Sequence, residues 1–266
     1  MLDVKNLSKT FSPGTVNQRT ALQNLTLHLN SGDFLTIIGS NGAGKSTLFN
    51  AISGVFLPDS GSIALDGKDI TFAKEHKRAT AIGRIFQDTN KGTAPNMTIE
   101  ENLALAYLRS SGKRSLLGIT QADRRLFREQ LSLLDLGLEN RLTTKVGLLS
   151  GGQRQAVALL MCTLVTPRLL LLDEHTAALD PATAEKVLAI TKNIVQEKNI
   201  TCMMITHNIS SALQLGNRTI MMDDGHIVLD LTGEDRAAMT VPRLLEVFKA
   251  KAAKDFDNDR MLLQAM

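Results

Sequence analysis

Residues 39–46 combine glycines with a lysine and a serine at a spacing that suits phosphate binding. They fit the pattern Gly-x-x-x-x-Gly-Lys-[Ser/Thr] at every fixed position. Glycines let backbone N–H groups turn inward around phosphate oxygens, and a helix that begins after the loop adds its positive end. We therefore expect Lys45 on the β- and γ-phosphates of a nucleotide and Ser46 on Mg²⁺. The residues expected to contact the nucleotide are Gly39, Ser40, Asn41, Gly42, Ala43, Gly44, Lys45, Ser46 and Thr47.

An apolar run that ends in two acidic residues is the second chemical feature. Residues 169–172 are four leucines, which predict a central strand of a parallel sheet, and ligands lie at the carboxyl ends of such strands. Asp173 is then placed to hold Mg²⁺ through water, and Glu174 to activate the attacking water as general base. Taken alone, the run would also suit a strand that leaves the core into a solvated acidic turn. The phosphate loop favours the catalytic interpretation.

A serine and two glycines open a strongly helical stretch near residue 150. Ser150 suits the N-cap position, and Gly151 and Gly152 leave backbone N–H groups exposed at a helix N-terminus. That arrangement is a second anion-binding site. Because one chain then offers two phosphate-binding helix ends, we expect the second to serve the nucleotide of another subunit.

In this order and spacing the motifs resemble those of an ATP-binding cassette (ABC) ATPase, over about residues 2–248. The phosphate loop, Leu-Ser-Gly-Gly-Gln at 149–153, Leu-Leu-Leu-Leu-Asp-Glu at 169–174 and a later His207 carry the resemblance. It implies an α/β fold: a P-loop NTPase (RecA-like) core, an antiparallel β subdomain and an all-helical insert. It also implies a head-to-tail homodimer that holds two ATP molecules, each between one copy's phosphate loop and the other's signature residues, here Ser150, Gly151, Gly152 and Gln153.

The resemblance assigns roles to four further residues. Gln87 matches the loop glutamine that senses Mg²⁺ and the attacking water, and His207 matches the switch histidine on the γ-phosphate, so both join Glu174 as catalytic residues. Asp180 lies in the loop that runs between the two nucleotide sites. Phe11 stands where the family usually has a tyrosine stacked on adenine, although an aromatic residue beside a turn can also simply pack. The set implied to hold Mg²⁺ is Ser46, Gln87 and Asp173.

One departure from the family is visible beside the general base. His175 follows Glu174, where the family commonly has proline. A titratable imidazole at this position could change the local charge near neutral pH. The alternative is that His175 simply occupies a turn of the loop.

The elements that must position these residues follow from the hydrophobic pattern. We expect strands at 2–4, 25–29, 33–38, 62–65, 169–173, 201–205 and 219–222, helices at 47–54 and 181–197, and turns at 12–14, 59–61 and 66–67. Residues 98–166 are expected to be helical and to begin with a capping box at 98–101. Strands that alternate with helices predict an α/β core with a parallel sheet. We expect one domain over 1–248, with 1–87 and 166–248 forming the core and β subdomain, 88–165 the helical insert, and 249–266 a tail.

Composition excludes several classes of protein. The 266 residues are 43% hydrophobic and 21% charged, as in ordinary globular chains. No apolar run reaches the roughly 18–20 residues of a membrane span, and the first residues do not resemble a secretory signal. The net charge of +3 and the ten aromatic residues argue against nucleic acid as a partner. The two cysteines match no metal or redox spacing, and we expect them to be small buried hydrophobic residues.

Basic residues gather locally, at 74–78 and again at Arg109, Lys113, Arg114, Arg124, Arg125 and Arg128. They form either a solvated helix face or a surface close to anionic headgroups or to a partner's loop.

A finer resemblance involves residues 83–88, 92–103 and 173–181. These segments resemble a bacterial subgroup that accompanies permeases and substrate-binding lipoproteins in uptake systems, some of them assigned to tryptophan and tyrosine. It implies a motor subunit at the cytoplasmic face of the membrane that powers import of a small solute such as an amino acid. The alternatives are an exporter ATPase and a non-transport cassette acting on DNA or ribosomes, although the latter usually carries long coiled-coil inserts, zinc modules or two fused cassettes. A scaffold without turnover is disfavoured by Glu174 together with His207.

Overall fold

A computed structural model describes residues 1–88, 91–111 and 118–251. The chain divides into two compact units, Met1–Arg78 with Thr201–Met266, and Ala79–Ile200. The residues 88–165 expected as a helical insert belong to the second unit, and their boundaries stay a prediction. The expected tail, 249–266, lies outside the described residues from position 252 onward, as do Lys113 and Arg114.

The first unit contains an antiparallel sheet with the strand order β2-β1-β4-β5. Leu2 pairs with Leu29 and is fully buried, whereas the neighbouring pair Asp3 and His28 faces outward and is joined by a 2.7 Å hydrogen bond. This alternation is the period-two pattern of the sequence. The strands are β1 (Leu2–Phe11), β2 (Arg19–Leu29), β4 (Ser60–Leu65) and β5 (Lys68–Asp69).

The structure confirms the predicted turn at 66–67 but only part of the one at 59–61. The turn at 66–67 is confirmed, because Asp66 and Gly67 both have positive φ, 51° and 75°, as a tight hairpin needs. The turn at 59–61 is wrong in its last two residues, which begin β4. Gly61 sits there at φ 88°, and a Cβ on it would lie 2.4 Å from the carbonyl oxygen of Asn6 on β1. The glycine therefore allows close approach of two strands.

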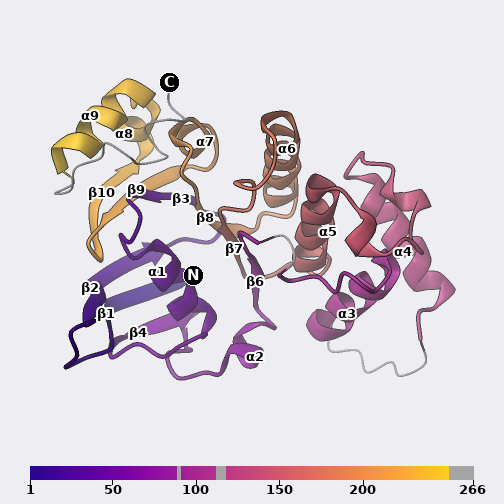
Figure 1. Cartoon of the computed structure of the whole chain (residues 1–266), viewed down its shortest axis with the longest axis horizontal. Helices are drawn as coiled ribbons and strands as arrows, with labels where there is room; N and C mark the ends of the chain where they lie inside the picture. Colours follow the sequence, from indigo (N-terminus) through magenta and orange to yellow (C-terminus); the bar gives the residue numbers. More distant parts are fainter. Residues whose placement is uncertain (89–90, 112–117, 252–266) are drawn as a thin grey trace. The chain divides into compact units, whose positions relative to one another are not determined.

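The described residues of the same unit also form strands in the order β10-β9-β3-β8. Strand β3 runs parallel to both β8 and β9, and β10 returns antiparallel to β9. The strands are β3 (Phe34–Gly39), β8 (Thr201–Ile205), β9 (Arg218–Asp223) and β10 (His226–Thr232), and the helices are α1 (Lys45–Ser53), α2 (Glu75–Arg78), α7 (Ile209–Gln214), α8 (Gly233–Ala237) and α9 (Val241–Lys251). Figure 1 shows α7, α8 and α9 gathered beside β9 and β10.

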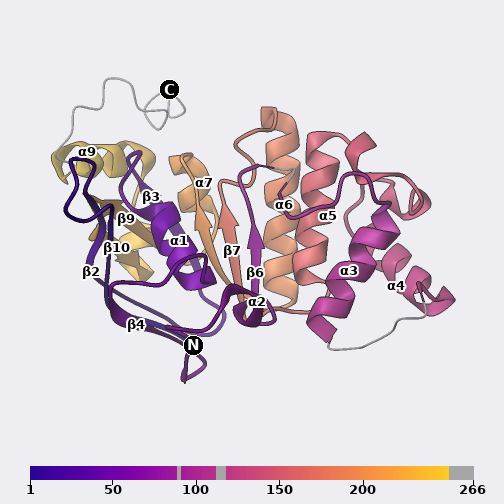
Figure 2. The same cartoon turned by 60° about the horizontal axis from the view of Figure 1, so that its bottom comes forward.

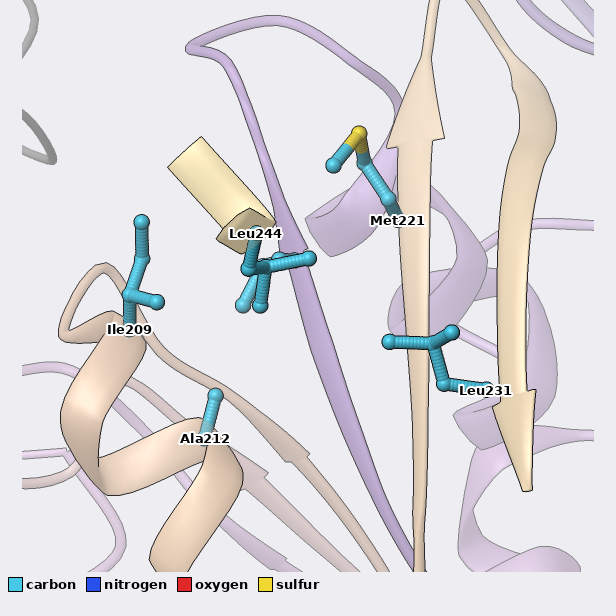
Figure 3. Close-up of a cluster of buried hydrophobic side chains, with 6 residues drawn as sticks. Ile209, Ala212, Met221, Leu231 and Leu244 are labelled. Atoms are coloured by element: carbon cyan, nitrogen blue, oxygen red, sulfur yellow. The ribbon is translucent and has the colours of Figure 1, made fainter. Parts of the chain in front are cut away.

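A buried apolar cluster fixes α7 against the strands. Ile209 and Ala212 of α7 meet Met221 of β9, Leu231 of β10 and Leu244 of α9 (Figure 3). Each of these side chains is at most 5% exposed. Because α7 begins two residues after His207, the cluster also holds the backbone that carries this histidine.

Arg78 corrects the surface interpretation of the basic segment 74–78. Its side chain is only 3% exposed, and its guanidinium donates to the carbonyl oxygens of Ala51 and Ile52 at 2.7 and 2.8 Å. Two further bonds go to the carbonyls of Thr71 and Ala73. Arg78 therefore satisfies the carboxyl end of α1, and burial lowers its pKa from the ordinary value.

In the described part of the second unit there are two parallel strands and four helices of 12 or more residues. Leu171 of β7 lies opposite Arg84 of β6, and all five residues of β7 are buried. Figure 2 shows α6, α5 and α3 side by side. The elements are β6 (Ile82–Ile85), β7 (Leu169–Asp173), α3 (Ile99–Ser111), α4 (Gln121–Ser132), α5 (Gly151–Thr163) and α6 (Pro181–Glu197), with short 3₁₀ turns at Leu138–Asn140 and Val146–Leu148.

The predicted helical stretch 98–166 is confirmed in part. Its capping box is present, since the Thr98 N–H donates to the Glu101 carboxylate at 2.6 Å and the Glu101 N–H to the Thr98 hydroxyl at 3.3 Å. The prediction is wrong between α4 and α5, where Asp135 and Gly137 take positive φ and interrupt the helix. Residues 112–117 of this stretch lie outside the described part.

Two further expectations concerned membrane-spanning segments and the burial of the two cysteines. Within the described residues, no helix combines the length and the apolar character that a membrane crossing requires. Cys202 is fully buried in β8, and burial raises the pKa of its thiol. Cys162 is only half-buried, and its thiol donates to the Arg84 carbonyl oxygen at 3.3 Å.

Candidate active site

The phosphate loop follows β3 directly and leads into α1. Gly39 and Gly44 have φ of 148° and 99°. A Cβ at Gly39 would lie 2.2 Å from the Met222 carbonyl oxygen, and one at Gly44 would lie 2.4 Å from that of Ala21. Both positions therefore exclude any other residue, and the loop keeps its inward-turned backbone.

The start of α1 is built to receive an anion. Gly44 occupies the N-cap position, and no side chain of the described residues caps the helix there. The first backbone N–H groups of α1, which include those of Ser46 and Thr47, have no partner within the helix itself, and the helix dipole is positive at this end. Lys45, 5% exposed, folds into the loop and donates to the carbonyls of Gly39 and Ser40.

The turn between β9 and β10 supports the phosphate loop, which the sequence analysis did not foresee. The Ser40 hydroxyl donates to the Asp223 carboxylate at 3.2 Å, and the Gly225 N–H donates to the Ala43 carbonyl oxygen at 3.1 Å. Asp223 ends a buried parallel strand, as Asp173 does. An aspartate at the end of an apolar strand is the sequence signal that could have pointed to Asp223.

Arg19 is a second residue that the sequence analysis missed. It begins β2, and its guanidinium donates to the Gly42 carbonyl oxygen at 2.6 Å. A Cβ at Gly42 would lie 2.2 Å from that guanidinium. The contact places a positive charge beside the loop.

The acidic residues lie where the sequence placed them, at the carboxyl end of β7. Asp173 is the last residue of the strand and 8% exposed, and Glu174 follows it, half-buried, at φ 47°. Arg84 of β6 reaches Asp173 with 3.4 Å between Nη2 and Oδ2, and its guanidinium also stacks on the Phe86 ring at 4.7 Å. Arg84 was not predicted, although a charged residue in a short apolar strand was a visible signal.

Two of the predicted catalytic side chains meet in the second unit. The Gln87 amide donates from Nε2 to Oε2 of Glu174 at 3.0 Å. Gln87 follows β6 and Glu174 follows the parallel neighbour β7, so the carboxyl ends of both strands bring the pair together. The interaction fixes the direction of the Glu174 carboxylate.

The signature residues form the first turn of α5. Ser150 is the N-cap, its hydroxyl accepts from the Gln153 N–H, and the Gln153 side chain accepts from the Ser150 N–H, both at 3.3 Å. Gly152 has a packing role as well, because a Cβ on it would lie 2.2 Å from Cγ2 of Thr183 on α6. The predicted N-cap is confirmed.

Comparisons with known proteins give the family of the chain. A family model described as ABC transporter matches residues 22–177, more than half of the chain. The chain belongs to the ABC transporter family. The tyrosine transport ATP-binding protein of Clostridioides difficile (strain R20291) is 46% identical over 252 residues, which cover 94% of this chain and 99% of that protein. The methionine import ATP-binding protein MetN 2 of Enterococcus faecalis is 35% identical over 86% of this chain and 64% of that longer protein.

Solved structures of ABC cassettes share the fold. The dimeric ATP-binding cassette MJ0796 in a post-hydrolysis state bound to ADP and Pi superposes with a TM-score of 0.75 at 30% identity, covering 87% of this chain and 98% of that one. The ADP conformation of the cassette MJ1267 gives 0.75 at 26% identity, over 94% and 98%. The expected P-loop NTPase fold of an ABC ATPase is confirmed, and the chain is an ATP-binding, ATP-hydrolysing subunit of this family.

The remaining predicted site residues of this ABC ATPase lie in both units. Asp180 caps α6 through the Thr183 N–H at 3.0 Å, and hydrogen bonds with the Thr183 side chain and backbone lower the pKa of its carboxyl. His207 is half-buried between β8 and α7. Phe11, 38% exposed, meets the Phe56 ring edge-on with 5.3 Å between centroids. Phe11 therefore packs and also stays accessible, so both interpretations of it remain.

Proposed function

We propose that this ABC ATPase drives the import of a small solute, with an amino acid as the cargo. The support is its 46% identity, over almost the whole chain, with a protein named for tyrosine transport, and its similarity to a methionine import protein. A permease on another chain would form the passage, and a substrate-binding lipoprotein would deliver the cargo to that permease. The ATPase would act at the cytoplasmic face of the membrane as a peripheral subunit.

The observation that carries the proposed chemistry is the 3.0 Å hydrogen bond between Gln87 and Glu174. It supports Glu174 as the general base, because a base must be held in one direction to take the proton of an attacking water. Lys45 would bind the β- and γ-phosphates, His207 would contact the γ-phosphate, and Phe11 would stack on adenine.

We infer that Mg²⁺ would be bound by the three residues that the family resemblance assigns to it. Ser46, Gln87 and Asp173 offer a hydroxyl, an amide and a carboxylate oxygen, and Mg²⁺ prefers oxygen ligands. Because Gln87 donates its amide N–H to Glu174, its amide oxygen is the end it would turn to the ion. The described residues contain no cluster of three or more His, Cys, Asp or Glu that could hold a metal. When bound, Mg²⁺ neutralises charge on the phosphate oxygens.

Two copies of the chain would close around two ATP molecules. The exposed N-cap Ser150 and the helix end behind it would bind the γ-phosphate held by the phosphate loop of the other copy. Contacts that exist only with ATP present shift the equilibrium toward the closed dimer, and hydrolysis removes them. The solved cassette with ADP and Pi is a dimer, which supports this arrangement.

The variant Glu174→Gln tests the role of the proposed base. It keeps the shape and a hydrogen-bonding group, so ATP should still bind while hydrolysis falls by about 10²- to 10⁴-fold. Dimers should accumulate with MgATP, as measured by light scattering. Glu185→Gln, an exposed position on α6, is the matched control and should hydrolyse ATP like the wild type. A Glu174→Gln variant with wild-type hydrolysis would refute the assignment.

Partner and cargo need a separate experiment. A tagged chain recovered from detergent-solubilised native membranes should bring with it a multi-span permease, identified by mass spectrometry. Cells that lack the chain should lose uptake of labelled tyrosine, and the wild-type gene, but not Glu174→Gln, should restore it. Recovery of ribosomal or DNA-bound partners, or export of the labelled amino acid, would contradict the import proposal.

A further inference from the structure

The backbone that carries Glu174 adopts an unfavourable conformation. Its φ of 47° is left-handed, a conformation in which the Cβ of an L-residue crowds the following carbonyl oxygen. The turn closes with the Ala177 N–H donating to the Glu174 carbonyl oxygen at 3.0 Å. Such a conformation persists only where surrounding contacts determine it.

His175, the next residue, makes the contact that can determine it. Its ring is 2% exposed, and Nε2 lies 3.1 Å from Oγ1 of Thr191 in the buried middle of α6. The Thr191 hydroxyl donates its one proton to the Val187 carbonyl oxygen at 2.8 Å. It can therefore only accept from the imidazole, so Nε2 carries the proton.

We propose that His175 is a positioning residue for Glu174: its hydrogen bond to Thr191 holds the left-handed turn that directs the Glu174 carboxylate toward Gln87. The inference rests on the proposed role of Glu174 as general base, and it assigns a function to the buried imidazole beside it. The buried hydrogen bond to α6 is the contact that holds the backbone at this position.

The loop between β7 and α6 runs from Glu174 to Asp180, and its second end supports this view. Asp180 ties the loop to the first turn of α6 through the Thr183 N–H at 3.0 Å, while His175 ties its beginning to Thr191, two turns further along the same helix. The loop is thus attached to α6 at both ends. Loss of the His175 bond would free only the end beside Glu174.

Paired variants test the proposal by separating the hydrogen bond from side-chain volume. His175→Leu and Thr191→Val remove the donor and the acceptor, whereas His175→Gln and Thr191→Ser keep them. In single-turnover hydrolysis with the full chain in excess over MgATP, the first pair should be slower by about 10- to 100-fold, the scale of a misplaced catalytic group. The second pair should stay within about threefold of wild type, and the ATP dissociation constant should stay within about twofold for all four.

Thr163→Val is the matched control for the loss of a buried helix hydroxyl. Thr163 on α5 is fully buried and donates to Leu159 four residues earlier at 2.8 Å, as Thr191 does to Val187, but without a link to His175. Its variant should hydrolyse ATP at the wild-type rate. A slow rate in Thr163→Val equal to that of Thr191→Val would overturn the proposal, because general destabilisation would then explain both.

A double variant separates this inference from the proposed function. Adding His175→Leu to Glu174→Gln should cause no further loss, because the effect of His175 passes through Glu174. If Thr191→Val hydrolyses ATP at the wild-type rate while Glu174→Gln is inactive, the positioning role of His175 is wrong. The assignment of Glu174 as the base then stands. An active Glu174→Gln would instead refute the assignment of the base. Should His175→Leu fail to fold, the comparison of Thr191→Val with Thr191→Ser still decides.

Discussion

At the scale of single residues, the buried imidazole of His175 couples folding to pH. Burial lowers its pKa from 6.5 to about 4, so the unfolded chain takes up this proton at a higher pH than the folded chain. The neutral, buried His175 therefore makes its full contribution to the free energy of unfolding above pH 6.5. This contribution is lost as the pH falls toward 4. Between pH 7 and 4.5 wild type should lose about 2 kcal/mol of unfolding free energy relative to His175→Gln, which cannot titrate. Urea unfolding across this pH range measures the difference, and parallel curves for the two proteins would contradict it.

At the scale of elements, Gly152 sets how closely α5 approaches α6. Helix propensity alone would make Gly152→Ala stabilising, but its Cβ would lie 2.2 Å from the Thr183 methyl. We expect the variant to lose about 1–3 kcal/mol of unfolding free energy through overpacking, as measured by urea unfolding. Thr183→Ser, which deletes that methyl group, should restore most of the loss in the double variant. A stabilised Gly152→Ala would show that the helices separate at no cost.

The same elements show what sequence can and cannot provide. Strand β7 and helix α6 coincide with their predicted residues because one is a continuous apolar run and the other begins with an Asp N-cap and a proline. Strand β6 was missed because Gly83 and Arg84 interrupt its short apolar pattern. Arg84 contacts Asp173, which lies 89 positions further along the chain. Ser40 contacts Asp223, which lies 183 positions further along. The residue types at these positions were visible in the sequence, but no local pattern reports which distant residue each of them contacts. The motifs therefore predicted the chemistry but not the contacts that hold it in place.

At the scale of the whole molecule, the question is whether a second copy completes each nucleotide site. Ser150→Asp and Ser150→Asn both keep a good N-cap, but only aspartate adds negative charge where the other copy's γ-phosphate would bind. In the Glu174→Gln background with MgATP, the Asn variant should dimerise and the Asp variant should stay monomeric in light scattering, because like charges at close range repel. Both should bind a fluorescent ATP analogue equally as monomers, since the phosphate loop of the same chain is unchanged. Equal dimerisation would mean that the α5 terminus does not face the partner's nucleotide, whereas lost monomer binding would place Ser150 in its own chain's site.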